Sequence, residues 1–149
     1  MSLSNASEND LLLLYFNNTN VANMGDATGV RGSTVAGSLF VSLHTADPGE
    51  TGTQSTSETS YTGYARVAVA RSGAGWTVSG TAPTQVANAA IITFGTSTVG
   101  TPTITHFGVG LETSGATRLL ASGALTASQV INLGGVNTFA AGALVITVD

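Results

Sequence analysis

The feature that most constrains the fold is a short strand that runs into a rigid turn, between residues 39 and 49. Its first six residues alternate between two faces, Leu39, Val41 and Leu43 on one and Phe40, Ser42 and His44 on the other. This pattern predicts a β-strand with one wholly apolar face. The turn at 47–49 ends it, because Pro48 has no amide proton for a continuing ladder and Gly49 accepts a positive φ.

A polar segment and a second strand follow this turn. Residues 50–60 contain no apolar side chain, which predicts a surface loop. Residues 64–71 predict the strand, in which Arg66 and Arg71 stand among valines and alanines. An arginine in such a strand must reach a carboxylate or a row of carbonyls. The candidate partners are Glu58, Asp47 and the loop of a neighbouring subunit.

Three strings of residues around this unit carry a family resemblance. They are Gly32-Ser33-x-x-Ala36-Gly37-Ser38, Ser42-Leu43-His44-Thr45-Ala46-Asp47-Pro48-Gly49, and Ser60-Tyr61-Thr62-Gly63-Tyr64-Ala65-Arg66-Val67-Ala68-Val69 with Arg71 and Trp76. With them the chain resembles a family of small tailed-bacteriophage virion proteins, usually described as tail-fibre or uncharacterised structural proteins. The likeness runs from the amino-terminal helix to the carboxy-terminal strand. It implies a place in the virion and brings no catalytic residue with it.

Length and composition favour one β-rich domain over residues 1–149. A chain of 149 residues buries about two-thirds of its extended surface. Leu, Val, Ile and Phe number 37, enough for a core, while Ala, Gly, Ser and Thr number 77. Because Gly and Thr disfavour helix interiors, this balance fits close sheet packing better than a helical bundle.

The charge content excludes some partners. The chain has four arginines and no lysine against eight carboxylates, and phosphate recognition needs a cluster of cations, so we expect no nucleic-acid binding. The apolar run 11–16 is too short to span a membrane, and no basic residue precedes it as in a signal peptide. We expect synthesis and assembly in the host cytoplasm. So few charges suit an assembly subunit, or alternatively an extracellular β-domain.

Residues 4–17 predict an amino-terminal helix, with Asn5 and Glu8 as its capping pair and Asn17-Asn18 at its end. The apolar block 11–16 surrounds the helix rather than following one face. Either the helix is enclosed within the domain, or another subunit or the virion shell covers its outer side. On the second reading Leu12 and Phe16 are the outer contacts.

The remaining sequence predicts an extended arm and a sandwich. Residues 18–37 are rich in glycine and predict the arm. Further strands are predicted at 76–78, 86–94, 104–111, 118–125, 129–133 and 143–148. Their spacing predicts a mainly β fold, a single-domain antiparallel β-sandwich over 38–149 with jelly-roll or Greek-key wiring and an amino-terminal α-helix.

No catalytic, metal or cofactor site is predicted. His44 and Asp47 could join a serine in a triad, but a histidine beside a turn aspartate more often ties down the turn. The chain has no cysteine, and its two histidines lack a zinc-site spacing. Calcium binding by loop 47–58 is the weaker alternative to a solvated loop.

An aromatic sugar platform is the other binding-site alternative. Trp76, Tyr61 and Tyr64 could stack on a sugar, but aromatic residues beside a buried strand are more often core or interface residues.

Three functions remain open from the sequence. The first is a capsid decoration or cement protein, the second a tail-fibre or host-binding module, and the third a carbohydrate-binding sandwich. The absence of repeats and coiled-coil segments favours the first. The expected partners are copies of the chain itself, as a dimer or trimer, and other virion proteins such as the major capsid protein. The expected interface residues are Leu12, Tyr15, Phe16, Glu58, Tyr61, Tyr64, Arg66 and Arg71.

Overall fold

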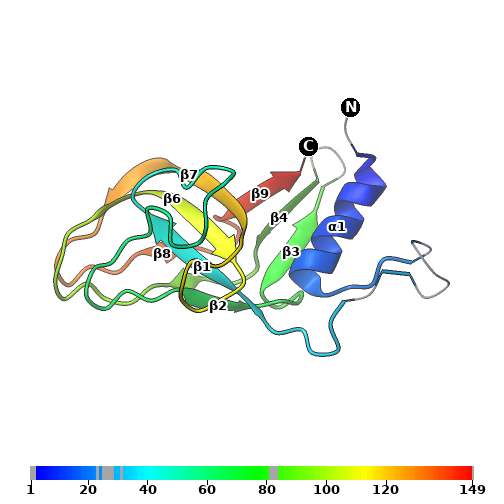
Figure 1. Ribbon diagram of the computed structural model, residues 1–149, viewed down its shortest axis with the longest axis horizontal. Coiled ribbons are helices and arrows are strands. Elements are labelled where there is room, and N and C mark those ends of the chain that lie inside the picture. The colour runs from blue at the N-terminus through cyan, green and yellow to red at the C-terminus, as the bar shows by residue number, and fades with distance from the viewer. Residues whose placement is uncertain (1–2, 23, 25–28, 31, 81–83, 149) are drawn as a thin grey trace. The chain divides into compact units, whose positions relative to one another are not determined.

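The computed structural model describes residues 3–22, 24, 29–30, 32–80 and 84–148 (Figure 1). The chain forms two compact units. Unit 1 comprises Met1–Ser38, Ala70–Ile91 and Phe139–Asp149, and unit 2 comprises Leu39–Val69 and Ile92–Thr138. The predicted fold class is confirmed: the protein is mainly β, its named strand pairs are antiparallel, and it begins with a helix. That residues 1–149 act as one domain stays a prediction.

Helix α1 spans Asn5–Asn17 in unit 1 and is capped at both ends, by a side chain at its start and by the backbone at its end. Ser4, rather than the predicted Asn5, is the N-cap, since its hydroxyl accepts from the Ser7 amide. The predicted end is confirmed: Asn18 adopts a left-handed conformation with a φ of 56° and its amide donates to a carbonyl of the last turn.

The helix packs on a three-stranded sheet in the order β3-β4-β9, formed by Trp76–Ser79, Thr84–Asn88 and Val145–Val148. It lies along β3 and β4 (Figure 1). Leu12 and Phe16 are each only 3% exposed, and the ring of Phe16 meets Trp76 edge-on at 5.0 Å. The expectation that these two residues lie on the outer side of the helix is therefore wrong. The outward residue is Tyr15, at 48% exposed.

The predicted arm 18–37 folds back on itself. An isolated antiparallel bridge joins Val21 to Val30. Farther in, the side-chain amide of Asn18 donates to the Ser33 carbonyl at 2.8 Å and its oxygen accepts from the Ser33 amide at 2.7 Å. Asn18, directly after the helix, therefore binds Ser33 and holds the two ends of the segment 18–33 close together.

Unit 2 is built on a four-stranded sheet in the order β2-β1-β6-β7. Its strands are Val67–Ala70, Ser38–His44, Thr103–Gly110 and Leu119–Val130. Two short strands, β5 (Ile92–Thr93) and β8 (Thr138–Phe139), form a separate pair. In the central pair, β1 runs antiparallel to β6, with Val41 opposite Val109 and Ser42 opposite Gly108.

Strand β1 is buried on both of its faces. The apolar face predicted from Leu39, Val41 and Leu43 is confirmed, but Ser42 and His44 on the other face are also fully buried. A Cβ atom at Gly108 would lie 2.6 Å from His44 Nε2 and 2.7 Å from Ser42 Oγ. Gly108 therefore makes the room in which this polar pair packs.

Several predicted strand boundaries are wrong. The predicted strand 64–71 is shorter, because β2 begins only at Val67. The predicted strand 86–94 is two strands, because the Asn88 side chain binds the carbonyls of Ala90 and Ala140 and turns the chain between them. The predicted strands 118–125 and 129–133 are one strand, β7, whose register against β6 shifts twice.

Candidate interaction site

Arg66 and Glu58 form a buried ion pair in unit 2. The Arg66 Nε donates to Glu58 Oε1 and its Nη2 to Glu58 Oε2, both at 2.7 Å, a bidentate arrangement. The guanidinium also donates to the carbonyls of Glu112 and Gly115 and to the Ser55 hydroxyl. Its side chain is only 2% exposed. Of the predicted partners the structure selects Glu58, and each of the three guanidinium nitrogens of Arg66 donates within the chain.

Tyr64 extends this cluster to strand β1. Its hydroxyl donates to Glu58 Oε1 at 2.8 Å and accepts from the Leu43 amide at 3.1 Å. Burial, and then the nearby Glu58 charge, raise the pKa of Tyr64 far above its ordinary value of 10.0. The phenol therefore stays protonated and serves as a fixed donor.

Arg71, by contrast, secures the helix in unit 1. Its Nε and Nη2 donate to the carbonyls of Tyr15 and Leu14, at 2.7 and 2.6 Å, and its Nη1 donates to the Ser33 hydroxyl. A cation at the carbonyl end of a helix is stabilising because it offsets the partial negative charge there. Of the predicted interface residues, Arg71 and Tyr15 thus meet in unit 1, whereas Glu58, Tyr61, Tyr64 and Arg66 meet in unit 2.

The loop at residues 50–60 is not a strand and lies largely at the surface, as predicted, but it also packs against its own unit. Gln54 is fully buried, and its amide group donates to the Phe40 carbonyl and accepts from the Glu112 amide and the Thr117 hydroxyl. It fits because a Cβ at Gly110 would overlap it. Sequence reasoning missed Gln54. Two features could have indicated its burial: it is a long side chain in a run of small ones, and the strand at 103–110 contains a glycine that leaves room for it.

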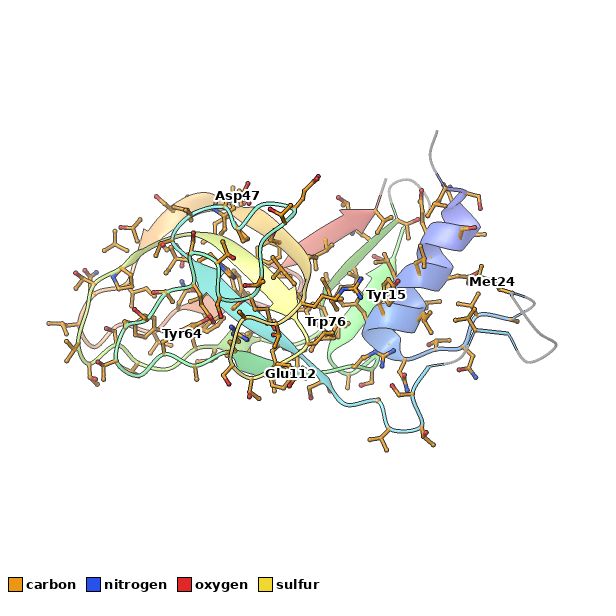
Figure 2. All side chains as sticks on the ribbon, viewed as in Figure 1. Tyr15, Met24, Asp47, Tyr64, Trp76 and Glu112 are labelled. Carbon is orange, nitrogen blue, oxygen red and sulfur yellow. The ribbon has the colours of Figure 1, made fainter. Side chains whose placement is uncertain are left out.

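Ser42 and His44 form another buried polar pair, and the sequence did not indicate this one. His44 Nδ1 lies 2.8 Å from the Thr56 carbonyl, so it carries the proton, and Nε2 then accepts from the Ser42 hydroxyl at 2.8 Å. Burial lowers the pKa of His44 below its ordinary 6.5. Asp47 takes no part: its carboxylate accepts from the Gly49 amide and caps its own turn, at an exposed position (Figure 2). A triad of His44, Asp47 and serine is not assembled.

The aromatic residues do not form a sugar platform. Trp76 is fully buried in unit 1, where it packs on Phe16 (Figure 2). Tyr61 and Tyr64 belong to unit 2, where Tyr64 stacks on Phe94 at 6.2 Å and Tyr61 is only 6% exposed. These rings fill cores, as the alternative interpretation held.

Two open hollows flank the segment 58–61 of unit 2. One, of about 590 Å³, lies towards residues 99–102, and the other, of about 460 Å³, lies towards residues 113–115. Serine and threonine hydroxyls and backbone line most of both. The one ionic group shared by their walls, Glu58, is already neutralised by Arg66, so neither hollow presents a net charge to a ligand.

Within the described ranges, no three His, Cys, Asp or Glu residues gather as metal ligands would. No described helix has the length and apolar content to cross a membrane.

Comparison with protein families gives a match to nearly the whole chain. The model of a family described as "Podophage GP4 fiber I protein gp80" matches residues 2–147. None of the curated proteins matches the chain. Because the family match covers nearly all of the chain, the protein belongs to the family of podophage GP4 fiber I protein gp80 and is a bacteriophage virion structural protein.

Proposed function

We propose that this chain is a non-enzymatic subunit of a virion fibre, which acts by binding copies of itself and neighbouring virion proteins. The observation that carries the proposal is the family match over residues 2–147, whose description names a fibre protein. The description supports a fibre over the capsid decoration that the sequence favoured.

The placement of charged groups supports a role in assembly through neutral contacts. Two of the four arginines, Arg66 and Arg71, spend their donors on groups of the same chain. Between Arg71 and Glu112 the sequence has no Asp, Glu, Lys or Arg, and none lies between Arg118 and Asp149. Contacts made by these segments therefore rest on the backbone, on polar side chains without a carboxylate, ammonium or guanidinium group, and on apolar side chains.

Capsid decoration is the second candidate function, on which the major capsid protein would be the partner. One observation favours it: the sequence carries no internal repeat, and the only helix in the described residues has 13 residues. Long fibres usually need repeats, coiled coils or threaded strands, so a short chain of this kind would sit at a fibre's base or on a shell.

The number of copies per virion tests the proposal. Purified virions would be quantified by mass spectrometry with isotope-labelled peptides of this chain and of the major capsid protein. A fibre subunit is expected at a small multiple of the tail symmetry, and antibody labelling should mark one vertex. Hundreds of copies distributed over the shell would contradict the fibre proposal and favour decoration.

A further inference from the structure

The edges of the described sheets differ in length, and one edge is unlike the others. The edge strands β2, β3 and β9 have four residues each, and β5 and β8 have two each. Short edges give little template for another chain, which is a common way to prevent unwanted pairing. Strand β7 is the exception, with 12 residues at the edge of the four-stranded sheet.

Strand β7 also lacks the side chains that usually protect an edge. Its sequence, LLASGALTASQV, has no lysine, no other charge and no proline. Charges and prolines at an edge discourage pairing, the first by repulsion and the second by removing a donor. Its register against β6 shifts twice, and at one shift residues 125–128 form an irregularity between Ala124, opposite His106, and Gln129, opposite Ile104.

The second half of β7 is open to another chain. The five residues from Thr126 to Val130 are all exposed, whereas a strand with one buried face would alternate. The first four residues of β7 instead line a hollow of about 280 Å³ together with Gly49, Glu50 and Gly52. Among the described residues, none forms a backbone hydrogen bond with the outer edge of β7. The free edge is therefore the segment 123–130.

Exposed aliphatic side chains adjoin this free edge. They are Val99, Val130, Leu133 and Val136, whose side chains are between 46% and 65% exposed. Backbone hydrogen bonds join the two loops that carry them: Ile131 to Pro102, Gly134 to Ser97, and Ser97 to Gly135. An interface at the edge would thus have apolar surface beside its hydrogen bonds.

We propose that β7 pairs antiparallel with β7 of a second copy of this chain, about a twofold axis that crosses segment 123–130. A second copy of β7 has the same length as this edge, whereas every other described edge strand is much shorter. Because the strand is uncharged, bringing two copies together places no like charges opposite each other. A twofold contact is also closed, so each copy satisfies the outward peptide groups of the other and no edge is left to propagate. The inference deepens the proposed structural role by naming the partner.

Cysteine scanning tests the pairing directly, because the native chain contains no cysteine. Single cysteines would be placed at each position from 123 to 130 and oxidised under mild conditions. In antiparallel twofold pairing one position lies opposite itself, so disulfide-linked dimer should peak at one residue and fall on both sides. No cross-linking, or equal cross-linking at all eight positions, would overturn the proposal.

A charge placed on the edge gives an independent test with a matched control. Ser128→Lys adds a cation to the exposed part of β7, and Ala68→Lys adds the same cation to an exposed position of the opposite edge strand, β2. Sedimentation equilibrium should show dimer dissociation constants at least tenfold higher for S128K and unchanged for A68K. Equal effects of the two variants, or no effect of S128K, would overturn the proposal.

The outcomes also separate this inference from the proposed function. A chain that stays monomeric at high concentration but is found in virions would overturn self-pairing and leave the structural role intact. A β7-linked dimer that never enters virions would support the pairing and contradict the fibre role.

Discussion

Arg66 and Glu58 show how a buried charge is tolerated in this protein. The cation is removed from water, and its three nitrogens find acceptors on the carboxylate, two carbonyls and one hydroxyl. The acceptor farthest from Arg66 in the chain, the Gly115 carbonyl, is 49 residues away. One side chain therefore ties the loop at 50–60 and the segment 112–115 to the start of β2.

Arg66→Met should be strongly destabilising. Removing one partner of a buried ion pair costs about 3–5 kcal/mol because the other charge stays behind without compensation. That is a large part of the net stability of about 5–15 kcal/mol that is typical of a domain. Urea denaturation would measure it, with the exposed Arg118→Met as the control. A loss under about 0.5 kcal/mol at Arg66, as at an ordinary surface site, would contradict the role of the pair.

His44 should make the protein sensitive to mild acid. Burial lowers its pKa in the folded state, opposed by Glu58 and the Thr56 carbonyl and reinforced by Arg66 and His106. The unfolded chain therefore takes up the proton first, below a pH of about 6.5, and the free energy of unfolding falls as the pH drops from there to the lowered folded pKa. Above that window no such loss is present.

The measurement is chemical denaturation at pH 7.5, 6.5 and 5.5. The wild type and His106→Gln should both lose stability on acidification over this range. His44→Gln should be less stable than the wild type at pH 7.5, since it disturbs the bonds to Ser42 and Thr56, but should depend less on pH. An unchanged pH dependence in His44→Gln would show that other groups are responsible.

At the scale of single elements, helix α1 has an inner stripe and an outer side. Glu8, Leu12 and Phe16 are its buried residues, at the spacing of one helical face. The remaining leucines of the apolar block are half-buried, so none of them lies wholly in water.

Phe16→Ala should therefore destabilise the fold, whereas Tyr15→Asp should leave the stability of the fold unchanged. Removing the ring that meets Trp76 should cost about 3–5 kcal/mol, the usual range for a buried aromatic. Tyr15→Asp should leave the fold intact, as judged by circular dichroism and melting. If the outer side of the helix is an assembly surface, as the sequence analysis suggested, Tyr15→Asp should also reduce incorporation into virions. Normal incorporation would leave α1 a purely internal element.

The loop at 50–60 should be cut by a glutamate-specific protease at Glu50 before Glu58. Glu50 is exposed, whereas Glu58 is held by Arg66 and Tyr64 and its backbone forms a bridge with His44. Cleavage at Glu58 then requires local opening of the loop. Mass spectrometry of early digestion products would give the order, and simultaneous cleavage at both sites would contradict the packing of this loop.

At the scale of the whole molecule, the charge content predicts that the protein does not bind nucleic acid. Four arginines, two of them engaged within the chain, cannot replace the counterions of a phosphate backbone. The purified protein should leave the mobility of duplex DNA unchanged at low salt. A shift that disappears as salt is raised would show a cationic surface that this composition does not suggest.

The sequence alone determined the features that depend on near neighbours. The alternation in 39–44, the turn at 47–49 and the helix near 5–17 all follow from periodicity, proline chemistry and capping, which act over a few residues. The mainly β class follows for the same reason, since it sums many such local preferences. The family resemblance likewise rests on strings of adjacent residues, and the family match agrees with it.

Tertiary structure decided everything that needed a distant partner. The polar face of β1 is buried because Gly108 leaves room for it, and Arg66 pairs with Glu58 rather than Asp47 because the loop returns beside β1. Likewise, the inner face of α1 is set by the position of Trp76, 60 residues after Phe16 in the chain. In each case the energy comes from contacts between segments that are far apart in the chain, and no local pattern records which segment will supply them.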